Sequence, residues 1–419
     1  MEKIEFDIVV IGGGPAGLAA LNKASDVSNL KVALIERDDY LGGILKQCIH
    51  DGFGLVKYKT LLAGPEYAAK EIELLKDKKN ITYFMKTFVF TIKQEKELYV
   101  LEAVNTKGAY KIYTKKIIFA TGCRERSAKQ ILIPGTNPSG VMTAGKAQYY
   151  VNKLGYLPGK NFVILGSGDI GLIMARRITL EGGKVLGVYE VRKTPSGLIR
   201  NINQCLNDFD IPLYLSTTVT RLIGENKLEA VEIMSLDKNG KYIESSKKIV
   251  PCDALILSVG LIPENELAES LGVKLSSTTN GIMIDQDFRS TSHPNIYACG
   301  NSVHVFDLVD YCSKSGEIAG TNASTNNKDQ QFIDVNPGSL IRYVIPNKIN
   351  LNSNIKDIMF NFRSIDDYQN KVLRIKQGNT IILEKALGDI KCAECQKYNI
   401  DLSKFTLTKD AITVSLEDK

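Results

Sequence analysis

The sequence predicts an α/β protein with two doubly wound parallel sheets, the second inserted in the first, and a small β-rich domain at its C-terminal end. Three observations carry this prediction. A strand–turn–helix–strand pattern opens the chain, the same pattern recurs from Asn161, and residues 332–419 contain short alternating strands. A chain of 419 residues is also too long for one ordinary hydrophobic core, which fits several domains.

The first copy of the pattern carries a glycine motif. An apolar strand at residues 5–11 leads into Gly12-x-Gly14-x-x-Gly17, and an alanine-rich helix follows. In such a motif the first glycine permits a tight turn, the second lets the backbone approach a pyrophosphate, and the third lets the helix pack close to the strand. The next strand ends in Glu36, about 20 residues further on, where a carboxylate accepts a hydrogen bond from a ribose hydroxyl. The pattern predicts a dinucleotide site; the alternative is a glycine-rich turn without a ligand.

The second copy repeats this arrangement. A strand from Asn161 leads into Gly166-x-Gly168-x-x-Gly171, a helix follows, and the next strand ends in Glu190. Two such units in one chain predict two Rossmann-like domains and two dinucleotides, because each crevice holds one. The alternative is a second domain that remains as a scaffold after losing its ligand.

The acid at Glu190 favours NAD(H) over NADP(H). A 2′-phosphate close to this carboxylate would be repelled by roughly a few kcal/mol at an intermediate effective dielectric. Arg192 and Lys193 follow closely in the sequence, so NADP(H) remains open.

The composition narrows the class of protein. Hydrophobic residues make up 44% and charged residues 24%, and the net charge of +6 comes without a dense Lys/Arg block. Anionic cofactors account for such a charge, so we expect no nucleic-acid partner. No apolar run approaches the length of a membrane span, and Glu2, Glu5 and Asp7 argue against a secretory leader. The eight scattered cysteines favour a reducing compartment, so we expect a cytoplasmic protein without a transmembrane segment.

Five ordered motifs carry a family resemblance. They are VVIGGGPAGLAA, IIFATG, VILGSGDIG, SVGLIPE and NIYACGN. Together they resemble the flavoproteins with two dinucleotide-binding domains in the pyridine nucleotide–disulfide oxidoreductase superfamily, over roughly residues 1–325. The resemblance implies FAD on the first unit and NAD(H) on the inserted second unit.

Domain boundaries follow from the two copies and the resemblance. We expect a discontinuous FAD-binding domain at residues 1–154 and 275–325, and an NAD(P)-binding domain at residues 155–274. A polar stretch at residues 321–331 is typical of a linker, and a C-terminal β-rich domain covers residues 332–419.

The motifs and the resemblance together name the expected contact residues, and no metal site is among them. The expected FAD contacts are Gly12, Gly14, Pro15, Ala16, Gly17, Glu36, Arg37, Gly43, Ile44, Val89, Ala120, Thr121, Gly122, Gly300 and Asn301. The expected NAD contacts are Gly166, Gly168, Asp169, Ile170, Gly171, Glu190 and Gly260. The family pattern has Asp where this chain has Asn301, which can still form hydrogen bonds but carries no charge.

A narrower resemblance points to a partner. The segments GGILKQCIHDGFG, GPEYA, GVMTAGKAQ and HVFDLVDY look like FAD-dependent subunits associated with glycerol-3-phosphate dehydrogenase-type enzymes. They are more distantly similar to α-subunits of sarcosine, proline and opine oxidases. This resemblance implies a flavoprotein dehydrogenase as second redox subunit, and we expect the C-terminal domain to help hold that assembly together. The alternative is that this domain caps the rest of the chain or pairs two copies in a homo-oligomer.

Cysteine usage departs from that of the disulfide reductases. The loop after Gly42-Gly43 has a single Cys48 and no partner at dithiol spacing, so a redox dithiol is not expected. Cys48 and His50 are the candidate catalytic residues, as a thiolate stabilised by an imidazolium. We favour the alternative that both pack and orient the flavin. The CxxC at Cys392 and Cys395 has too few ligands for a closed zinc site and is interpreted as incidental spacing.

The sequence thus predicts an FAD enzyme that passes electrons between NAD(H) and a second acceptor or donor. Hydride transfer between nicotinamide and flavin needs alignment of the two rings rather than a side-chain acid or base. Two alternatives remain. One is a stand-alone NADH oxidase that uses Cys48 as a sulfenic acid. The other is a structural FAD-containing subunit with an idle nicotinamide site.

Overall fold

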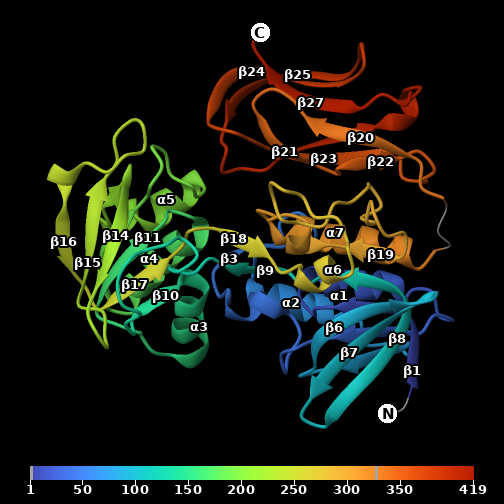
Figure 1. The fold of residues 1–419 in the computed structure, drawn as a ribbon, viewed down its shortest axis with the longest axis horizontal. Helices are drawn as coiled ribbons and strands as arrows, with labels where there is room; N and C mark the ends of the chain where they lie inside the picture. The colour runs from blue at the N-terminus through green and yellow to red at the C-terminus, as the bar shows by residue number, and fades with distance from the viewer. Residues whose placement is uncertain (1–2, 326–328) are drawn as a thin grey trace. The chain divides into compact units, whose positions relative to one another are not determined.

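The computed structural model describes residues 3–325 and 329–419, and the chain forms two compact units (Figure 1). The first unit contains Met1–Cys123 and Pro263–Lys419, and the second contains Arg124–Ile262. The chain passes between them at β9 (Cys123–Glu125) and β18 (Leu261–Pro263). Part of the expected linker, residues 326–328, lies outside the described residues. In the described ranges no helix is long and apolar enough to cross a membrane.

The first unit contains a seven-stranded sheet in the order β5-β2-β1-β8-β7-β6, with β19 also paired to β8. Strands β1, β2, β5, β8 and β19 are parallel, whereas β6 and β7 add an antiparallel edge. This confirms the predicted α/β class. The strands are β1 (Lys3–Ile11), β2 (Val32–Ile35), β5 (Ile81–Phe84), β6 (Phe88–Glu95), β7 (Leu98–Asn105), β8 (Gly108–Phe119) and β19 (Ile296–Ala298).

Two helices of this unit pack unusually close together. Glycines on α7 (Val309–Ala323) face α1 (Pro15–Ala24): a Cβ at Gly316 would overlap the carbonyl oxygen of Ala16, and one at Gly320 would overlap that of Ala20. Glycine is therefore required by the approach of the two backbones. The unit also contains α2 (Gly64–Glu73), α6 (Glu266–Ser270) and the short strands β3 (Asp51–Phe53) and β4 (Leu62–Ala63).

The second unit repeats the parallel architecture. Its five-stranded sheet has the order β10-β17-β11-β12-β13, and a separate antiparallel sheet contains β14, β15 and β16. The βαβ unit predicted from Asn161 is confirmed as β11, α4 and β12. The elements are β10 (Val141–Thr143), α3 (Ala144–Leu154), β11 (Asn161–Leu165), α4 (Asp169–Leu180), β12 (Lys184–Tyr189), α5 (Ile199–Cys205), β13 (Leu213–Tyr214), β14 (Thr217–Ile223), β15 (Ala230–Ser235), β16 (Lys248–Pro251) and β17 (Ala254–Leu257).

The C-terminal region is a two-sheet β domain within the first unit. One sheet has the order β22-β20-β27-β24-β25 and the other β21-β23-β26. Buried apolar side chains such as Phe360, Phe362 and Leu373 form its core, which confirms the predicted β-rich architecture. The strands are β20 (Phe332–Pro337), β21 (Ile341–Ile345), β22 (Lys348–Asn350), β23 (Asp357–Ser364), β24 (Tyr368–Gln377), β25 (Thr380–Ile390), β26 (Gln396–Asp401) and β27 (Ile412–Glu417).

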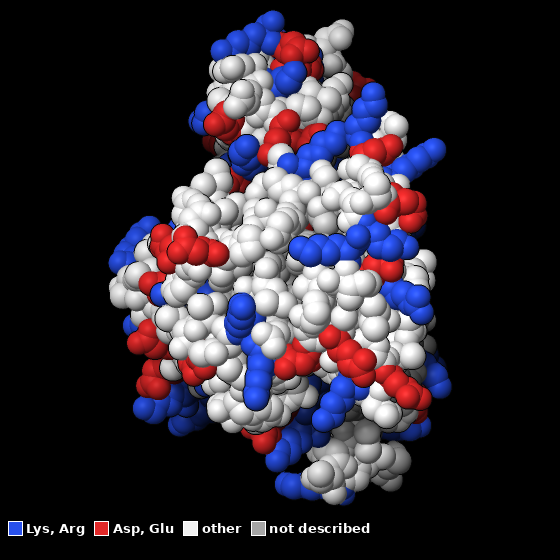
Figure 2. Space-filling model, turned by 90° about the vertical axis from the view of Figure 1, so that its left-hand side faces the viewer, with Lys and Arg blue, Asp and Glu red and all other residues white. Residues whose placement is uncertain are grey.

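Buried polar contacts join this domain to the rest of the first unit. Gln286 donates to the carbonyl of Asn350 and accepts from its N–H, both at 2.8 Å, and the Ser353 hydroxyl donates to Asp287 at 2.5 Å. On the outer surface, Figure 2 shows Lys and Arg mixed with Asp and Glu across the face in view.

The contact between α1 and α7 makes a stability prediction. Gly320→Ala places a methyl group against the Ala20 carbonyl, so the helices must separate, and we expect unfolding to become easier by about 1–3 kcal/mol. Gly388→Ala in β25 is the control, because an added Cβ there meets nothing within 4 Å; its effect should stay within about 0.5 kcal/mol. Urea unfolding measures both. Equal effects of the two variants would contradict the prediction.

Candidate functional site

The first glycine turn leaves room for a ligand at one position only. A Cβ at Gly12, whose φ is +105°, would overlap the Ala120 carbonyl, and a Cβ at Gly17 would overlap the Gly12 carbonyl. At Gly14, the N-cap of α1, an added Cβ meets nothing within 4 Å, and no side chain caps the helix. The turn is thus closed by its own backbone at Gly12 and Gly17 and open at Gly14, in front of a helix N-terminus that attracts anions.

Glu36 is held directly beside this turn. The carboxylate is buried and accepts from the Gly13 N–H at 2.6 Å and from the Asp38 N–H at 2.8 Å. These two bonds leave acceptor capacity on both oxygens for the hydroxyls of a ribose. Nearby in sequence to Ala120, the buried Thr121 hydroxyl has no hydrogen-bond partner among the described residues. An orphaned polar atom and an open glycine fit a dinucleotide in this crevice.

Gly300 and Asn301 reach the same end of α1 from a distant part of the chain. A Cβ at Gly300 would lie 2.7 Å from the Ala16 Cβ. The Asn301 amide is oriented at both ends: its oxygen accepts from the Phe306 N–H at 3.1 Å, and its nitrogen donates to Cys123 Sγ at 3.3 Å. The remaining N–H of the Asn301 amide can donate to a ligand.

The other predicted contact residues are distributed around this turn. A Cβ at Gly43 would lie 3.0 Å from Gly14 Cα, and Ile44 follows it with 57% of its surface exposed. Arg37 forms an ion pair with Glu264 at 3.2 Å. Val89 is different, because its side chain is buried in the apolar core of the sheet and only its backbone could face a ligand.

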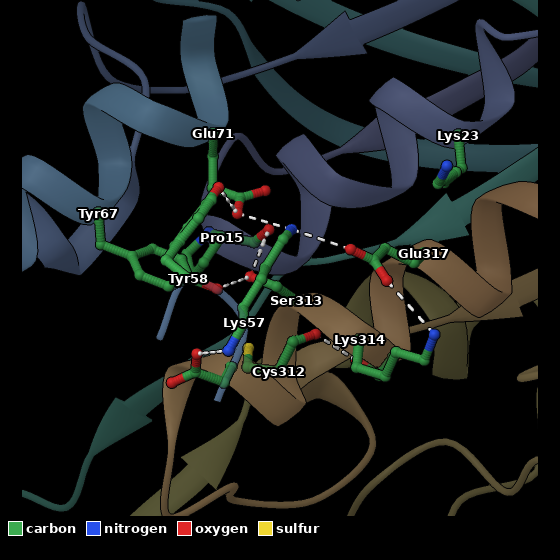
Figure 3. Close-up of polar contacts among 12 residues, drawn as sticks. Pro15, Lys23, Lys57, Tyr58, Tyr67, Glu71, Cys312, Ser313, Lys314 and Glu317 are labelled. Atoms are coloured by element: carbon green, nitrogen blue, oxygen red, sulfur yellow. Dashed lines mark hydrogen bonds and ion pairs between the residues drawn. The ribbon is translucent and has the colours of Figure 1, made fainter. Parts of the chain in front are cut away.

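The loop that carries Cys48 and His50 is followed in the chain by residues 54–58, which charged groups of α2 and α7 hold in place. Lys57 lies between Glu71 of α2 and Glu317 of α7, at 2.7 and 2.9 Å, and the Tyr58 hydroxyl donates to Glu71 at 2.7 Å (Figure 3). Asp310 accepts from the Gly54 and Lys57 N–H groups, at 3.2 and 2.7 Å. A network that joins one loop to two helices holds residues 54–58 in one position.

Cys48 has the surroundings of a neutral thiol. Its Sγ donates to the Ile44 carbonyl at 3.3 Å, and burial raises the pKa of the Cys48 thiol to about 12. The His50 ring packs against Phe53, with centroids 5.1 Å apart. A raised pKa disfavours the thiolate that a redox or nucleophilic role requires, so the surroundings favour the packing interpretation.

The second glycine turn repeats the backbone geometry of the first. Gly166, with φ +91°, takes the place of Gly12: a Cβ there would overlap the Ser258 carbonyl. Glu190 is buried and accepts from the Ser167 N–H at 2.9 Å and the Arg192 N–H at 3.0 Å, as Glu36 does from Gly13 and Asp38. The internal repeat therefore extends to the hydrogen bonds of both carboxylates.

Hydroxyl groups distinguish the second turn from the first. The Ser167 and Ser196 hydroxyls donate to the same Glu190 oxygen at 2.6 and 2.7 Å, and a Cβ at Gly168 would lie 2.9 Å from Ser258 Oγ. Sequence reasoning missed these three serines. Aligning the two copies would have found Ser167, which stands where the first copy has Gly13, but nothing in the pattern marks Ser196.

Asp169 is the first residue of α4, and its carboxylate is hydrogen-bonded to residues that follow β12. Its carboxylate accepts from the Leu198 N–H at 2.8 Å and from the Asn201 amide at 2.7 Å. The neighbouring Ile170 packs against the apolar core of this unit, and the Gly260 carbonyl accepts from the Arg126 N–H at 3.1 Å. The structure thus brings Gly166, Gly168 and Glu190 together, whereas Ile170 contributes mainly to packing.

Comparison with known proteins defines the family. The family model described as "Pyridine nucleotide-disulphide oxidoreductase" matches residues 6–316. The chain belongs to this family, and it is an oxidoreductase of the kind that binds FAD and NAD(P). The resemblance stated from the five motifs is confirmed.

Individual relatives are distant. The A subunit of opine oxidase from Agrobacterium tumefaciens (strain Ach5) is 23% identical over 72% of this chain, which spans 62% of that protein's length. Ferredoxin–NADP reductase 1 of Bacillus licheniformis is 25% identical over 78% of this chain and 90% of the relative. The crystal structure of T. acidophilum thioredoxin reductase has a TM-score of 0.62 at 22% identity, over 76% of this chain and 98% of that one. This last likeness concerns the fold.

The environment of Cys48 makes a pH prediction. A thiol with a raised pKa bears little thiolate at neutral pH, so its alkylation should be at least about a hundredfold slower than that of an ordinary cysteine. The rate should rise about tenfold for each unit between pH 7 and 10, because the pH stays below the pKa of Cys48. Mass spectrometry of the Cys48 peptide measures this, with the urea-unfolded chain as control. A plateau near pH 9 in the folded chain would show an ordinary thiol.

Proposed function

We propose that the first glycine turn holds FAD, that the second holds NAD(H), and that the chain passes electrons between NAD(H) and a second redox subunit. One observation carries the proposal: in both turns a buried carboxylate accepts a hydrogen bond from the N–H of the residue after the first glycine. Glu36 accepts from Gly13, and Glu190 accepts from Ser167. Such a pair fits two dinucleotides in one chain, each with its ribose on the carboxylate. We further propose residues 1–123 and 263–325 of the first unit as the FAD domain, and residues 124–262, the second unit, as the nicotinamide domain. The boundaries expected from the sequence, at residues 154/155 and 274/275, differ from these because β10 pairs with the second unit's sheet and α6 lies in the first unit.

Residues of this chain would hold FAD by its ends. Gly14 and the N-terminus of α1 would face the pyrophosphate, and Glu36 would accept from the adenosine ribose. Thr121 and Asn301 would supply hydrogen bonds to the remainder of the cofactor. When bound, FAD supplies the two-electron chemistry, and the side chains orient it and exclude water.

The preference for NAD(H) rests on Glu190. Its carboxylate accepts hydrogen bonds from Ser167, Ser196 and Arg192, so its position beside the turn is fixed. A fixed negative charge there accepts a ribose diol and repels a 2′-phosphate.

We also propose that the enzyme has no redox dithiol and works in the cytoplasm. The loop after Gly43 has Cys48 alone, and burial raises the pKa of that thiol. The partner proposal is supported by the opine oxidase relative, whose name describes one component of a larger enzyme. In this chain β25 is an edge strand of the C-terminal sheet, with an available outer side for docking of the partner or of a second copy.

The FAD proposal predicts the effect of one added side chain. In Gly14→Val the added Cβ meets nothing within 4 Å of the protein, so we expect the apoprotein to fold normally. FAD affinity should fall by at least about a hundredfold, because the branched side chain occupies the place of the pyrophosphate. Flavin fluorescence quenching measures the affinity, and thermal unfolding of the apoprotein is the control. Unchanged FAD affinity in the variant would refute this placement.

The nucleotide preference makes a separate prediction. Wild-type protein should bind NADH at least about tenfold more tightly than NADPH, and Glu190→Ala should narrow that ratio by removing both the ribose acceptor and the repulsion. Glu181→Ala, on the surface just after α4, is the control and should leave the ratio unchanged. Calorimetric titration with each nucleotide measures it. Tighter NADPH binding by the wild type would mean that Arg192 and Lys193 decide the preference.

A further inference from the structure

The segment between Asn301 and α7 joins the first glycine turn to the C-terminal β domain. At its near end, the Phe306 N–H donates to the Asn301 amide oxygen at 3.1 Å and so determines which way the amide nitrogen points. At its far end, the next residue, Asp307, is bound by groups of the C-terminal domain. Whatever holds Asp307 therefore also holds the main chain that orients Asn301.

Asp307 is bound by two groups of that domain. Arg363 of β23 forms an ion pair with one of its oxygens, and the Cys395 N–H donates to the other at 2.7 Å. Both charged side chains are largely buried, with 14% of Arg363 and 16% of Asp307 exposed. The ion pair is thus shielded from water and salt, unlike a surface pair.

Arg363 also contacts the chain on both sides of this ion pair. Its guanidinium donates to the Val305 carbonyl at 3.4 Å, to the Ala393 carbonyl, and to the Tyr343 hydroxyl at 3.0 Å. The planar guanidinium has five donors in one fixed geometry, so bonds to several groups at once define a single position for residues 305–307. A buried ion pair adds little to the net stability of a fold, because desolvation of the two charges offsets their attraction. Removing one partner, however, leaves an unpaired buried charge and can release the segment that the pair held in place.

The neighbouring histidine adds no competing charge. His304 is fully buried beside Phe306 and Tyr343, and burial lowers the pKa of its imidazole to about 3. Its Nε2 has no hydrogen-bond partner among the described residues. The ring therefore packs as a neutral group, and Arg363 is the charge that faces Asp307.

We propose that Asp307 and Arg363 are positioning residues for the flavin, and that the C-terminal β domain is thereby a working part of the FAD site. The pair fixes Phe306, Phe306 fixes the amide of Asn301, and Asn301 presents a set hydrogen-bond donor to the cofactor. This inference rests on the proposed binding of FAD at the first glycine turn. It assigns residues beyond the FAD-domain motifs to that site.

The chain offers a closely matched control for this pair. Asp367 accepts from the Cys392 N–H at 3.0 Å and pairs with Lys391 at 3.2 Å, so it holds the other end of the same Cys392–Cys395 turn. These bonds of Asp367 do not reach residues 301–307. Asp307→Asn and Asp367→Asn therefore loosen the same turn, but only the first substitution reaches the segment that orients Asn301.

The test compares FAD dissociation constants and the visible spectrum of bound flavin in the full chain. Asp307→Asn and Arg363→Met should each weaken FAD binding by about tenfold, which corresponds to about 1.4 kcal/mol. Both substitutions should also change the visible spectrum of the bound flavin. Arg363→Lys keeps the charge but loses the planar set of donors, so its effect should lie between those of the wild type and Arg363→Met. Asp367→Asn should leave both readouts unchanged. If Asp307→Asn fails to fold, Tyr343→Phe removes one Arg363 acceptor and should weaken FAD binding about threefold.

Two outcomes would overturn the inference. One is a lower unfolding temperature for Asp307→Asn and Arg363→Met with FAD affinity and spectrum unchanged, which would mean a purely structural role. The other is an equal effect of Asp367→Asn. Failure of the wild type itself to bind FAD would instead refute the proposed function, so the two failures are distinguishable.

Discussion

The bond between a buried carboxylate and the backbone of a glycine turn is the constraint on which both halves of this molecule depend. Glu36 and Glu190 each end a parallel strand and each accept from the N–H that follows the first glycine of their motif. This bond ties the second strand of each βαβ unit to the turn between the first strand and the helix. Any side chain at Gly12 or Gly166 would overlap the backbone carbonyl of Ala120 or Ser258 and push the turn away from it. The hydrogen bond between the turn and the carboxylate would then be lost. The same arrangement leaves a fixed negative acceptor next to a helix N-terminus, which is the combination that binds a ribose and a pyrophosphate.

Much of this could be predicted from the sequence because the signals are local. The strand, the spacing of the three glycines and the acid after the next strand all lie within one βαβ unit. The second copy of the unit has the same three features at the same spacing. The side-chain contacts of Ser196 and the pair of Asp307 with Arg363 could not be predicted, because they join residues whose separation follows no helical or strand period. Cys48 illustrates another limit: its spacing to His50 left both an activated thiol and a packing role open, with the packing role favoured. Burial, which sequence alone does not report, raises the pKa of the thiol and supports that packing role.

The two turns have diverged in their polarity. The first is lined by glycine and alanine and has an open position at Gly14, whereas the second adds hydroxyls from Ser167, Ser196 and Ser258. A tightly held cofactor and an exchanging nucleotide make different demands, and this contrast is consistent with assigning FAD to the first turn. The C-terminal domain contributes to the same assignment, because its Arg363 reaches the segment that orients Asn301.

The central claim is that one chain passes electrons between a nicotinamide and a flavin. The most direct measurement mixes the purified, FAD-loaded protein with NADH under anaerobic conditions and follows the visible absorbance of the flavin. If the nicotinamide of NADH reaches the flavin in this chain, a stoichiometric amount of NADH bleaches the flavin completely, without any added thiol or partner protein. A flavin that stays oxidised with excess NADH, yet is bleached by dithionite, would contradict this electron transfer and indicate an idle nicotinamide site.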